Sequence, residues 1–218
     1  MLTIYGCFRS RASRNIWLAY ELGVDFKHIP VIQAGRLADP LATTAPINTK
    51  SPEFLKVNPN GLIPAMEMDG LVLAESLAIN LFMAKKFGGD LAPRDLNEDA
   101  LMTQWAIWAM TEAEIHTIQI LYHKVMFPEA ARDPARLAEA VAALARPFRV
   151  LDEALAATGY LVGSRFTVAD LNMAEVIRYA QPVPELFEAA PRVKAWLAAC
   201  QARPAFQKMV AGRNAEPA

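Results

Sequence analysis

The feature that most constrains the fold of this chain is a change of pattern near residue 90. Before that point, short apolar runs alternate with stretches of helical periodicity, whereas every periodic segment after it is helical. The segments of the first part follow the order β-α-β-α-β-β-α, which predicts a small sheet covered by helices. We therefore expect an α/β domain over residues 1–88 and an all-helical domain over residues 98–218.

The first part begins with a strand and a helix joined by a short loop. The strand is Leu2–Tyr5, and the helix covers Ser10–Leu22. Either Ser10 or Ser13 can cap the first turn, and Gly23 can end the helix in the left-handed conformation.

The remaining segments of the first part are bounded by turn residues. Two apolar runs on either side of an Asp-Gly pair are typical of a β-hairpin. In chain order the segments are a strand Phe26–Ile32, a long polar connection Gln33–Lys50, a short helix Ser51–Leu55, hairpin strands Ile63–Met68 and Leu71–Ala74, and a helix Glu75–Phe87.

The second part contains only helical periodicity. The predicted helices are Asp99–Met126, Asp133–Leu155, Thr167–Tyr179 and Arg192–Gln201. Pro147 lies inside the second of them, so we expect a kink there. Thr167 and Asp170 have the Thr-x-x-Asp spacing of a capping box, which predicts a role in folding and none in chemistry.

Charge and cysteine content exclude several classes of protein. The 22 basic and 23 acidic side chains give a net charge of −1, which argues against a nucleic-acid or anionic-membrane partner. No run approaches the roughly 18 apolar residues of a membrane span, and the first residues do not resemble a signal peptide. Cys7 and Cys200 stand alone at opposite ends of the chain, which favours a reducing cytoplasm.

The segment Val57–Pro64 (VNPNGLIP), followed by the hairpin and by Glu75-Ser76, carries a family resemblance. On local grounds alone, Ile63-Pro64 can be an ordinary trans proline that opens a strand. In this context the sequence closely resembles the cytosolic glutathione S-transferases over the whole chain. The resemblance implies a thioredoxin-like first domain and the all-helical C-terminal domain of that family. It also implies a cis proline, with the backbone of Ile63 binding the cysteinyl part of glutathione like an added strand.

The same resemblance gives Glu75 and Ser76 a role in binding glutathione, the expected co-substrate. Locally, the pair can be no more than a helix start, although a helix N-terminus is also a site for anions. The resemblance implies that Ser76 binds the γ-glutamyl carboxylate and Glu75 the ammonium group. Alignment through Ser51 places Thr49 at the glycyl end, and Leu62 stands where many relatives have a lysine.

The first loop holds two candidate reactive residues, Cys7 and Ser10. Their C-x-x-S spacing also occurs in monothiol redox motifs, but the reactive group of a thioredoxin-like fold lies where the first helix begins, at Ser10. Ser10 matches the catalytic serine of theta- and zeta-like transferases, which precedes an arginine, here Arg14, so the resemblance is to a serine-type bacterial member of these classes. Such a serine stabilises the glutathione thiolate by a hydrogen bond. Ser13 is the alternative donor, and a purely capping role is the alternative for Ser10.

The resemblance also implies a pocket for a small hydrophobic electrophile, between the first loop and the helix that follows the linker. The candidate residues are Phe8 from the loop and Trp108, Glu112 and Ile115, which share one helical face. Aromatic residues at helical spacing, such as Trp105 and Trp108, are also common in cores.

Glu112, His116 and His123 are spaced in a way that is compatible with a metal site. An intrahelical pair and a solvated histidine are the commoner outcome of this spacing, so we expect no metal.

The expected activity is that of a transferase in detoxification, in which the glutathione thiolate attacks an electrophile. Two alternatives remain open: a glutathione-dependent isomerase or reductase, and a non-catalytic binding protein with the same fold. The family resemblance further implies a homodimer.

Overall fold

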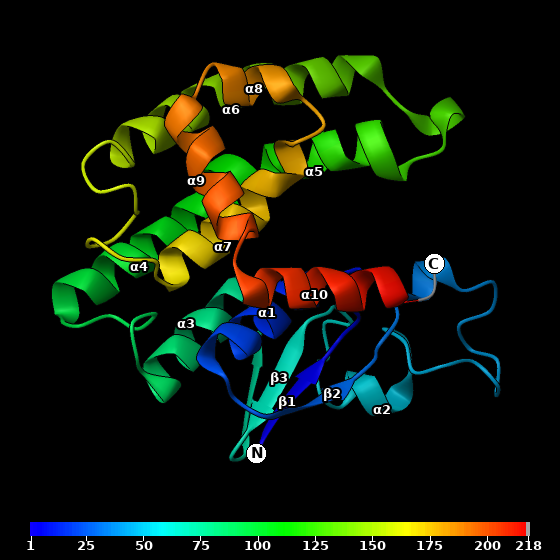
Figure 1. Cartoon of the computed structure of the whole chain (residues 1–218). Helices are drawn as coiled ribbons and strands as arrows, with labels where there is room; N and C mark the ends of the chain where they lie inside the picture. The colour runs from blue at the N-terminus through cyan, green and yellow to red at the C-terminus, as the bar shows by residue number, and fades with distance from the viewer. Residues whose placement is uncertain (217–218) are drawn as a thin grey trace. The chain divides into compact units, whose positions relative to one another are not determined.

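The computed structural model describes residues 1–216, which divide into two compact units (Figure 1). One unit is Met1–Gly89 together with the chain from Pro204 onward, and the other is Asp90–Arg203. The last helix, α10 (Pro204–Ala215), therefore belongs to the first unit and not to the helical domain predicted over residues 98–218. The physical reason is its packing on α1 (Ala12–Leu22), where the ring of Phe206 meets that of Trp17 edge-on at 4.9 Å.

The first unit is built on a four-stranded sheet. Its strands are β1 (Leu2–Tyr5), β2 (Phe26–Ile29), β3 (Ala65–Met68) and β4 (Leu71–Ala74), in the order β2-β1-β3-β4. β1 and β2 are parallel, which requires the crossover helix α1, whereas β3 is antiparallel to both of its neighbours. This arrangement confirms the thioredoxin-like α/β prediction. β2 is shorter than the predicted strand because Pro30 follows it and cannot donate to a ladder.

The turn residues of the first unit adopt the backbone conformations that the sequence predicts. Asp69 and Gly70 both have positive φ, 52° and 83°, as the tight hairpin turn between β3 and β4 requires. Gly23 ends α1 with φ of 64°. The other helical elements of this unit are a 3₁₀ turn Ala34–Arg36, α2 (Pro52–Leu55) and α3 (Ser76–Phe87).

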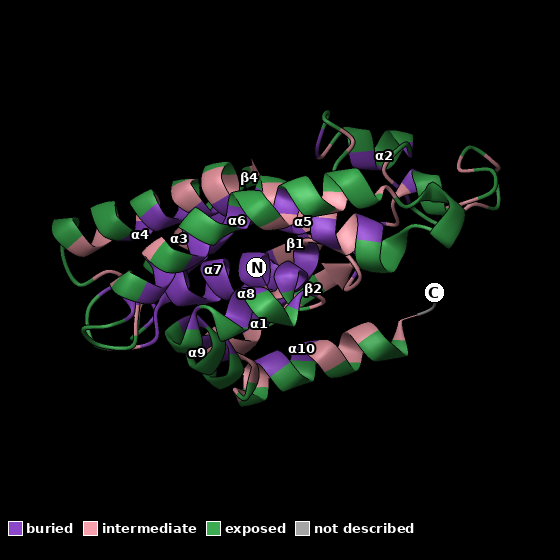
Figure 2. Ribbon diagram, turned by 90° about the horizontal axis from the view of Figure 1, so that it is seen from above, coloured by how far each residue is buried: buried purple, intermediate pink, exposed green. Residues whose placement is uncertain are grey.

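The second unit is entirely helical in its secondary structure, as predicted. Its helices are α4 (Leu96–Trp108), α5 (Ile115–Leu121), α6 (Pro134–Ala154), α7 (Val168–Ile177), α8 (Pro184–Glu188) and α9 (Pro191–Gln201). Its shorter elements are π-helical turns at Ala109–Glu114 and Tyr122–Met126 and 3₁₀ turns at Glu129–Ala131 and Arg178–Ala180. The helix expected at Asp99–Met126 is thus divided by π-helical turns, whereas α6 runs through Pro147 as one helix. All residues of α7 are buried, so α7 is the central helix of this unit (Figure 2).

The capping box at the start of α7 is present and extends beyond the two residues of the motif. The Asp170 carboxylate accepts hydrogen bonds from the backbone N–H of Thr167 at 2.9 Å and from its hydroxyl at 3.0 Å. It also accepts from the backbone N–H of Leu161 and from Nε1 of Trp196, each at 3.0 Å. Asp170 has no exposed surface, and it therefore joins three separate segments of the second unit.

An ion pair between Glu98 and Arg165 holds the start of this unit. The guanidinium of Arg165 donates to both carboxylate oxygens of Glu98, at 2.9 and 2.6 Å, and to the carbonyl of Ala92 at 2.8 Å. The hydrogen bonds from Arg165 lower the pKa of the Glu98 carboxyl from 4.5 to about 2. Arg165 therefore fastens the first turn of α4, through Glu98, and the segment before it, through Ala92, to the loop before α7.

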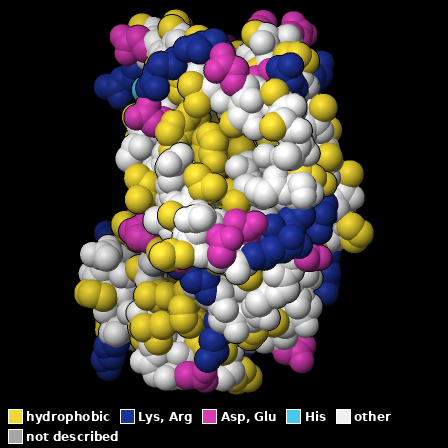
Figure 3. Space-filling view, turned by 90° about the vertical axis from the view of Figure 1, so that its left-hand side faces the viewer, with side chains coloured by type: hydrophobic (Ala, Val, Ile, Leu, Met, Phe, Trp, Pro, Cys, Tyr) yellow, Lys and Arg dark blue, Asp and Glu magenta, His cyan; other side chains and the backbone are white. Residues whose placement is uncertain are grey.

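Charged side chains of both signs lie interspersed on the face drawn in Figure 3, consistent with the net charge of −1. Within the described residues, none of the helices is long and apolar enough to cross a membrane.

Asp170→Ala should be strongly destabilising, because it leaves several buried donors without an acceptor. Each such donor costs about 1–3 kcal/mol, so the free energy of unfolding should fall by about 3 kcal/mol or more. Urea denaturation checks this value. The matched control is Asp133→Ala, which removes the cap of α6 that accepts from Ala135 and Arg136 on the surface. Equal losses in the two variants would contradict the role given to Asp170.

The Glu98–Arg165 pair should make stability depend on pH in acid. A carboxyl whose pKa is lowered by folding stabilises the folded state above its unfolded pKa and loses that contribution as the pH falls toward the folded value. Glu98→Gln should therefore lower the melting temperature most above pH 4.5, and the difference from the parent should shrink toward pH 2. Glu153→Gln, in an exposed pair with Arg149, is the control and should show little difference at any pH. A constant deficit for Glu98→Gln would contradict this prediction.

Candidate functional site

Ser10 lies at the start of α1 and is half-buried. Its hydroxyl donates to the carbonyl of Cys7 at 2.7 Å and accepts from the backbone N–H of Ala12 at 3.1 Å. Ser10 is thus the residue that caps the first turn of α1. Ser13, the alternative donor, is fully buried inside the unit, so Ser10 has the more accessible hydroxyl.

Gly6 brings the first loop close to the segment before β3. A Cβ at Gly6 would lie 2.7 Å from the Cβ of Ala12, 3.4 Å from that of Ile63 and 3.7 Å from the hydroxyl oxygen of Ser10. Gly6 also has a φ of 139°, which L side chains rarely adopt. Only glycine fits here, and its small size allows Ile63 and Ser10 to approach the same stretch of backbone.

The peptide bond between Ile63 and Pro64 is cis. The turn before it is held by Asn58, whose side-chain amide donates to the carbonyl of Leu62 at 2.7 Å. Among the residues that the structure describes, none forms a hydrogen bond with the backbone N–H or C=O of Ile63. Both groups are therefore available to an extended peptide, as the resemblance to the transferases implies.

Glu75 and Ser76 lie where β4 turns into α3. Glu75 is exposed and has a φ of 67°, an unusual value for a residue with a side chain. Such backbone outliers cost about 1–3 kcal/mol and cluster at functional sites. Ser76 is the first residue of α3, and its hydroxyl accepts from Nη1 of Arg14 at 3.1 Å. The hydroxyl proton of Ser76 is thus directed away from Arg14, and the arginine adds positive charge to the helix start.

A buried polar network between α1 and α3 surrounds this contact, and sequence reasoning missed it. The side-chain amide of Asn15 donates to the carbonyl of Ser76 at 2.8 Å and to the side chain of Asn80 at 2.7 Å. Asn80 in turn donates to the carbonyl of Arg14 at 3.3 Å. Arg14, Asn15 and Asn80 have no exposed surface. The signal that could have predicted it is the presence of Asn15 and Asn80 within the apolar patterns of the two helices.

Thr49 lies beside the turn at Gly61, and its hydroxyl accepts one hydrogen bond. The hydroxyl oxygen accepts from the backbone N–H of Ala34 at 3.0 Å. The carbonyl of Thr49 is 2.9 Å from the position that a Cβ at Gly61 would take, which accounts for the glycine there. Leu62, at the position where many relatives have lysine, is 64% exposed.

Cys7 is a buried thiol in this arrangement. It is 3% exposed, and its sulfur donates to the side-chain carbonyl of Gln33 at 3.4 Å. Burial raises the pKa of the Cys7 thiol. A thiol of this kind is protonated at neutral pH and inert, which argues against the redox interpretation of the C-x-x-S spacing.

The residues predicted for the electrophile pocket fall in both units. Phe8 belongs to the first unit, where its ring meets that of His28 edge-on at 5.2 Å. In the second unit, Trp108 packs edge-on against Trp105 at 5.3 Å, Glu112 pairs with Arg146, and Ile115 is exposed. The pocket shared by these residues stays a prediction.

His123, from the possible metal cluster, has a structural partner. Its Nδ1 accepts from the backbone N–H of Asp133 at 2.9 Å and ties the loop before α6 to the end of the preceding helix.

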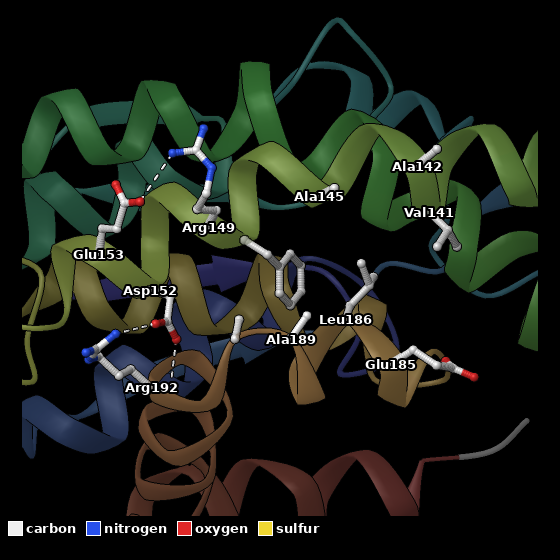
Figure 4. A pocket seen from close by; sticks show the side chains of 12 residues that line it. Val141, Ala142, Ala145, Arg149, Asp152, Glu153, Glu185, Leu186, Ala189 and Arg192 are labelled. Atoms are coloured by element: carbon white, nitrogen blue, oxygen red, sulfur yellow. Dashed lines mark hydrogen bonds and ion pairs between the residues drawn. The ribbon is translucent and has the colours of Figure 1, made fainter.

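A groove of ≈ 680 Å³ lies within the second unit, beside α6 and α8 (Figure 4). Apolar side chains such as Phe148 and Leu186 line it, and none of the residues predicted for the site does. The cations at its rim are matched by carboxylates: Arg149 contacts Glu153 at 3.2 Å, and Arg192 contacts Asp152 at 2.7 Å. Glu185 is the lining residue without a charged partner, so among the described residues the groove offers no unmatched cation for the carboxylates of glutathione.

Comparison with known proteins decides the family. The sequence matches the family descriptions "Glutathione S-transferase, N-terminal domain" over residues 8–86 and "Glutathione S-transferase, C-terminal domain" over residues 101–204. It is 36% identical over 204 residues to glutathione S-transferase 3 of Zea mays, an alignment that covers 88% of this chain and 84% of the maize protein. The chain belongs to the glutathione S-transferase family.

Solved transferase structures agree with the fold over nearly the whole chain. Glutathione transferase F7 from Populus trichocarpa superimposes with a TM-score of 0.82 at 30% identity, covering 98% of this chain and 100% of the poplar chain. The theta-class glutathione S-transferase of Xanthomonas axonopodis pv. citri, solved with glutathione bound, gives 0.79 at 30% identity over 96% of each chain. The chain described in this structure is therefore related to the theta and plant phi classes of the family.

Proposed function

We propose that this transferase binds glutathione at the first unit, lowers the pKa of its thiol through Ser10 and delivers the thiolate to a small hydrophobic electrophile. A sulfur–carbon bond forms to the electrophile, and a leaving group such as chloride departs with the electron pair of the broken bond. The choice of glutathione is supported by a relative, since the Xanthomonas theta-class structure was solved with glutathione bound.

The observation that carries the proposal is the free backbone of Ile63 beside the start of α1. The cysteinyl part of glutathione would pair with the N–H and C=O of Ile63, which no described residue uses. Because Gly6 brings Ser10 and Ile63 to the same stretch of backbone, the sulfur of a peptide held by Ile63 would lie near the Ser10 hydroxyl. The hydroxyl would then turn from the Cys7 carbonyl to the thiolate while it still accepts from Ala12.

The γ-glutamyl end would bind where α3 begins. Its carboxylate suits the N-terminus of that helix, where the Ser76 hydroxyl and the nearby Arg14 guanidinium favour negative charge. Its ammonium group would pair with the exposed carboxylate of Glu75. At the glycyl end, the Thr49 hydroxyl accepts from Ala34 and would donate its proton to the carboxylate, because the backbone N–H of Thr49 already donates to the carbonyl of Ile32.

Several finer features of the proposal rest on the family resemblance. They are the electrophile pocket at Phe8, Trp108, Glu112 and Ile115, the homodimer, the bacterial origin and the cytoplasmic location. The location is also supported by the two cysteines, since Cys7 and Cys200 are both buried and neither forms a disulfide. A glutathione-dependent isomerase or reductase would keep Ile63, Glu75 and Ser76, and turnover of a chlorinated aromatic with glutathione separates a non-catalytic binder from the catalytic alternatives.

Ser10→Ala removes the proposed thiolate donor and leaves the other contacts of the tripeptide in place. Glutathione should bind within a few-fold of the parent, while kcat/KM with a chlorinated nitroaromatic should fall by about 10- to 1,000-fold, as for the loss of one preorganised donor. The absorbance of the bound thiolate should titrate at higher pH, because a hydrogen bond to the charged form lowers the thiol pKa.

The matched control for Ser10 is Cys7→Ala, which should leave binding and turnover nearly unchanged. If Cys7→Ala abolishes activity and Ser10→Ala does not, the redox interpretation of the first loop is correct and the proposed role of Ser10 is wrong.

Glu75→Ala should weaken glutathione binding by about 2 kcal/mol or more, because the variant leaves the ammonium group of the ligand without its partner. Calorimetry with glutathione measures this loss. Asp25→Asn removes another exposed carboxylate of the same unit, between α1 and β2, and should leave the affinity unchanged. An unchanged affinity in Glu75→Ala would remove this residue from the site.

A further inference from the structure

The backbone of the first loop is held by a carboxylate from the far end of the chain. The N–H groups of Phe8 and Arg9 both donate to the side chain of Glu216, at 2.9 and 2.8 Å. Each N–H binds a different carboxylate oxygen, so the contact is bidentate. Charge-assisted hydrogen bonds of this length are the stronger kind in proteins.

Glu216 reaches the loop because α10 packs against α1 within the first unit. Phe206 packs on Trp17, and Met209 has no exposed surface. One turn further, Gly212 lies against the ring of Phe8, where a Cβ would be 2.6 Å from the ring. These positions recur every three residues along one face of α10, which lies beside α1 in Figure 1.

Two arginines complete the hold on the loop. Nη2 of Arg36 donates to the carbonyl of Arg9 at 2.8 Å, and Nε of Arg9 donates to the carbonyl of Arg213 at 3.2 Å. The peptide groups on both sides of Arg9 are thus fixed, one by Glu216 and one by Arg36. The next residue is Ser10, so the direction of its side chain follows from these bonds.

We propose that Glu216 is a positioning residue for the reaction: its carboxylate fixes the Phe8–Arg9 backbone and thereby holds the Ser10 hydroxyl where the glutathione sulfur is activated. The inference rests on the proposed function and adds the C-terminal end of α10 to the machinery of the site.

The negative charge of Glu216 disfavours a nearby thiolate, whereas its hydrogen bonds to the loop position the Ser10 hydroxyl that stabilises one. Burial and then the charge of Glu216 raise the pKa of the Cys7 thiol, which lies next to Ser10. A thiolate at Ser10 would experience the same repulsion. On electrostatic grounds alone, a variant without this charge would therefore be the more active enzyme, whereas loss of positioning predicts a less active one.

The experiment compares Glu216→Ala, Glu216→Gln and the parent as full-length chains. The first measurement is hydrogen exchange of the Phe8 and Arg9 amides, and the second is steady-state conjugation of glutathione to a chlorinated nitroaromatic from pH 6 to 9. Glutamine keeps one acceptor oxygen, so Glu216→Gln should lie between the parent and Glu216→Ala. Asn214→Ala, exposed in the same last turn of α10, is the control and should match the parent.

For Glu216→Ala we expect exchange of the two amides to be at least about 10-fold faster, as for a locally opened segment. We expect kcat to fall by about 5- to 50-fold, since small misplacements of a reacting group cost this much. The KM for glutathione should stay within about twofold, and the deficit in kcat should be the same at pH 7 and pH 9.

Each other result overturns a defined part of the inference. A rise in activity would mean that Glu216 is an inhibitory occupant of the loop, and a deficit that disappears at high pH would mean that it acts on the thiol pKa. Unchanged amide exchange would show that the contact with the loop does not form. A parent that makes no conjugate, even with the expected exchange pattern, would instead refute the proposed function and with it the catalytic role of Glu216.

Discussion

The arrangement of the site depends on the buried contact between the starts of α1 and α3. A buried guanidinium is tolerated only where hydrogen bonds satisfy it, and Arg14 donates to the hydroxyl of Ser76. Asn15 and Asn80 bind the same two segments, so neither helix can slide past the other without exposing polar groups to an apolar interior. Because Ser10 precedes one helix and Glu75 the other, this network sets the spacing between the two ends of the proposed glutathione site.

The two sides of the site are prepared for a ligand in different ways. The backbone groups of Ile63 are unused by the described residues, so a peptide can bind them without displacing a protein contact. Ser10 instead donates to the carbonyl of Cys7 and must exchange that acceptor for the sulfur. The exchange is favourable because a hydrogen bond to a charged acceptor is roughly twice as strong as a neutral one. The same argument explains why a neutral thiol would leave the Ser10 hydroxyl where it is.

Much of the fold could be predicted because its signals are local. The Asp69-Gly70 hairpin, the end of α1 at Gly23 and the capping box at Thr167 each depend on residues within one turn of each other. The π-helical turns in the second unit were not predicted, because the list of apolar residues does not record where a helix changes from i→i+4 to i→i+5 hydrogen bonds. The Arg14 network and the Glu216 contact were missed for a further reason: their partners are more than 60 residues apart and no short motif records them.

The placement of α10 shows why a boundary inferred from periodicity differs from one that follows from contacts. Composition placed this helix with the helical half, yet its apolar face is Phe206 and Met209, which it buries in the first unit. A segment that ended at residue 88 would leave Trp17 without its aromatic neighbour and the Phe8 and Arg9 amides without their acceptor. The loop that carries Ser10 is therefore completed only when the last helix folds back onto α1. The precision of the thiolate donor depends on both ends of the chain, although every residue assigned to the thiolate lies near its beginning.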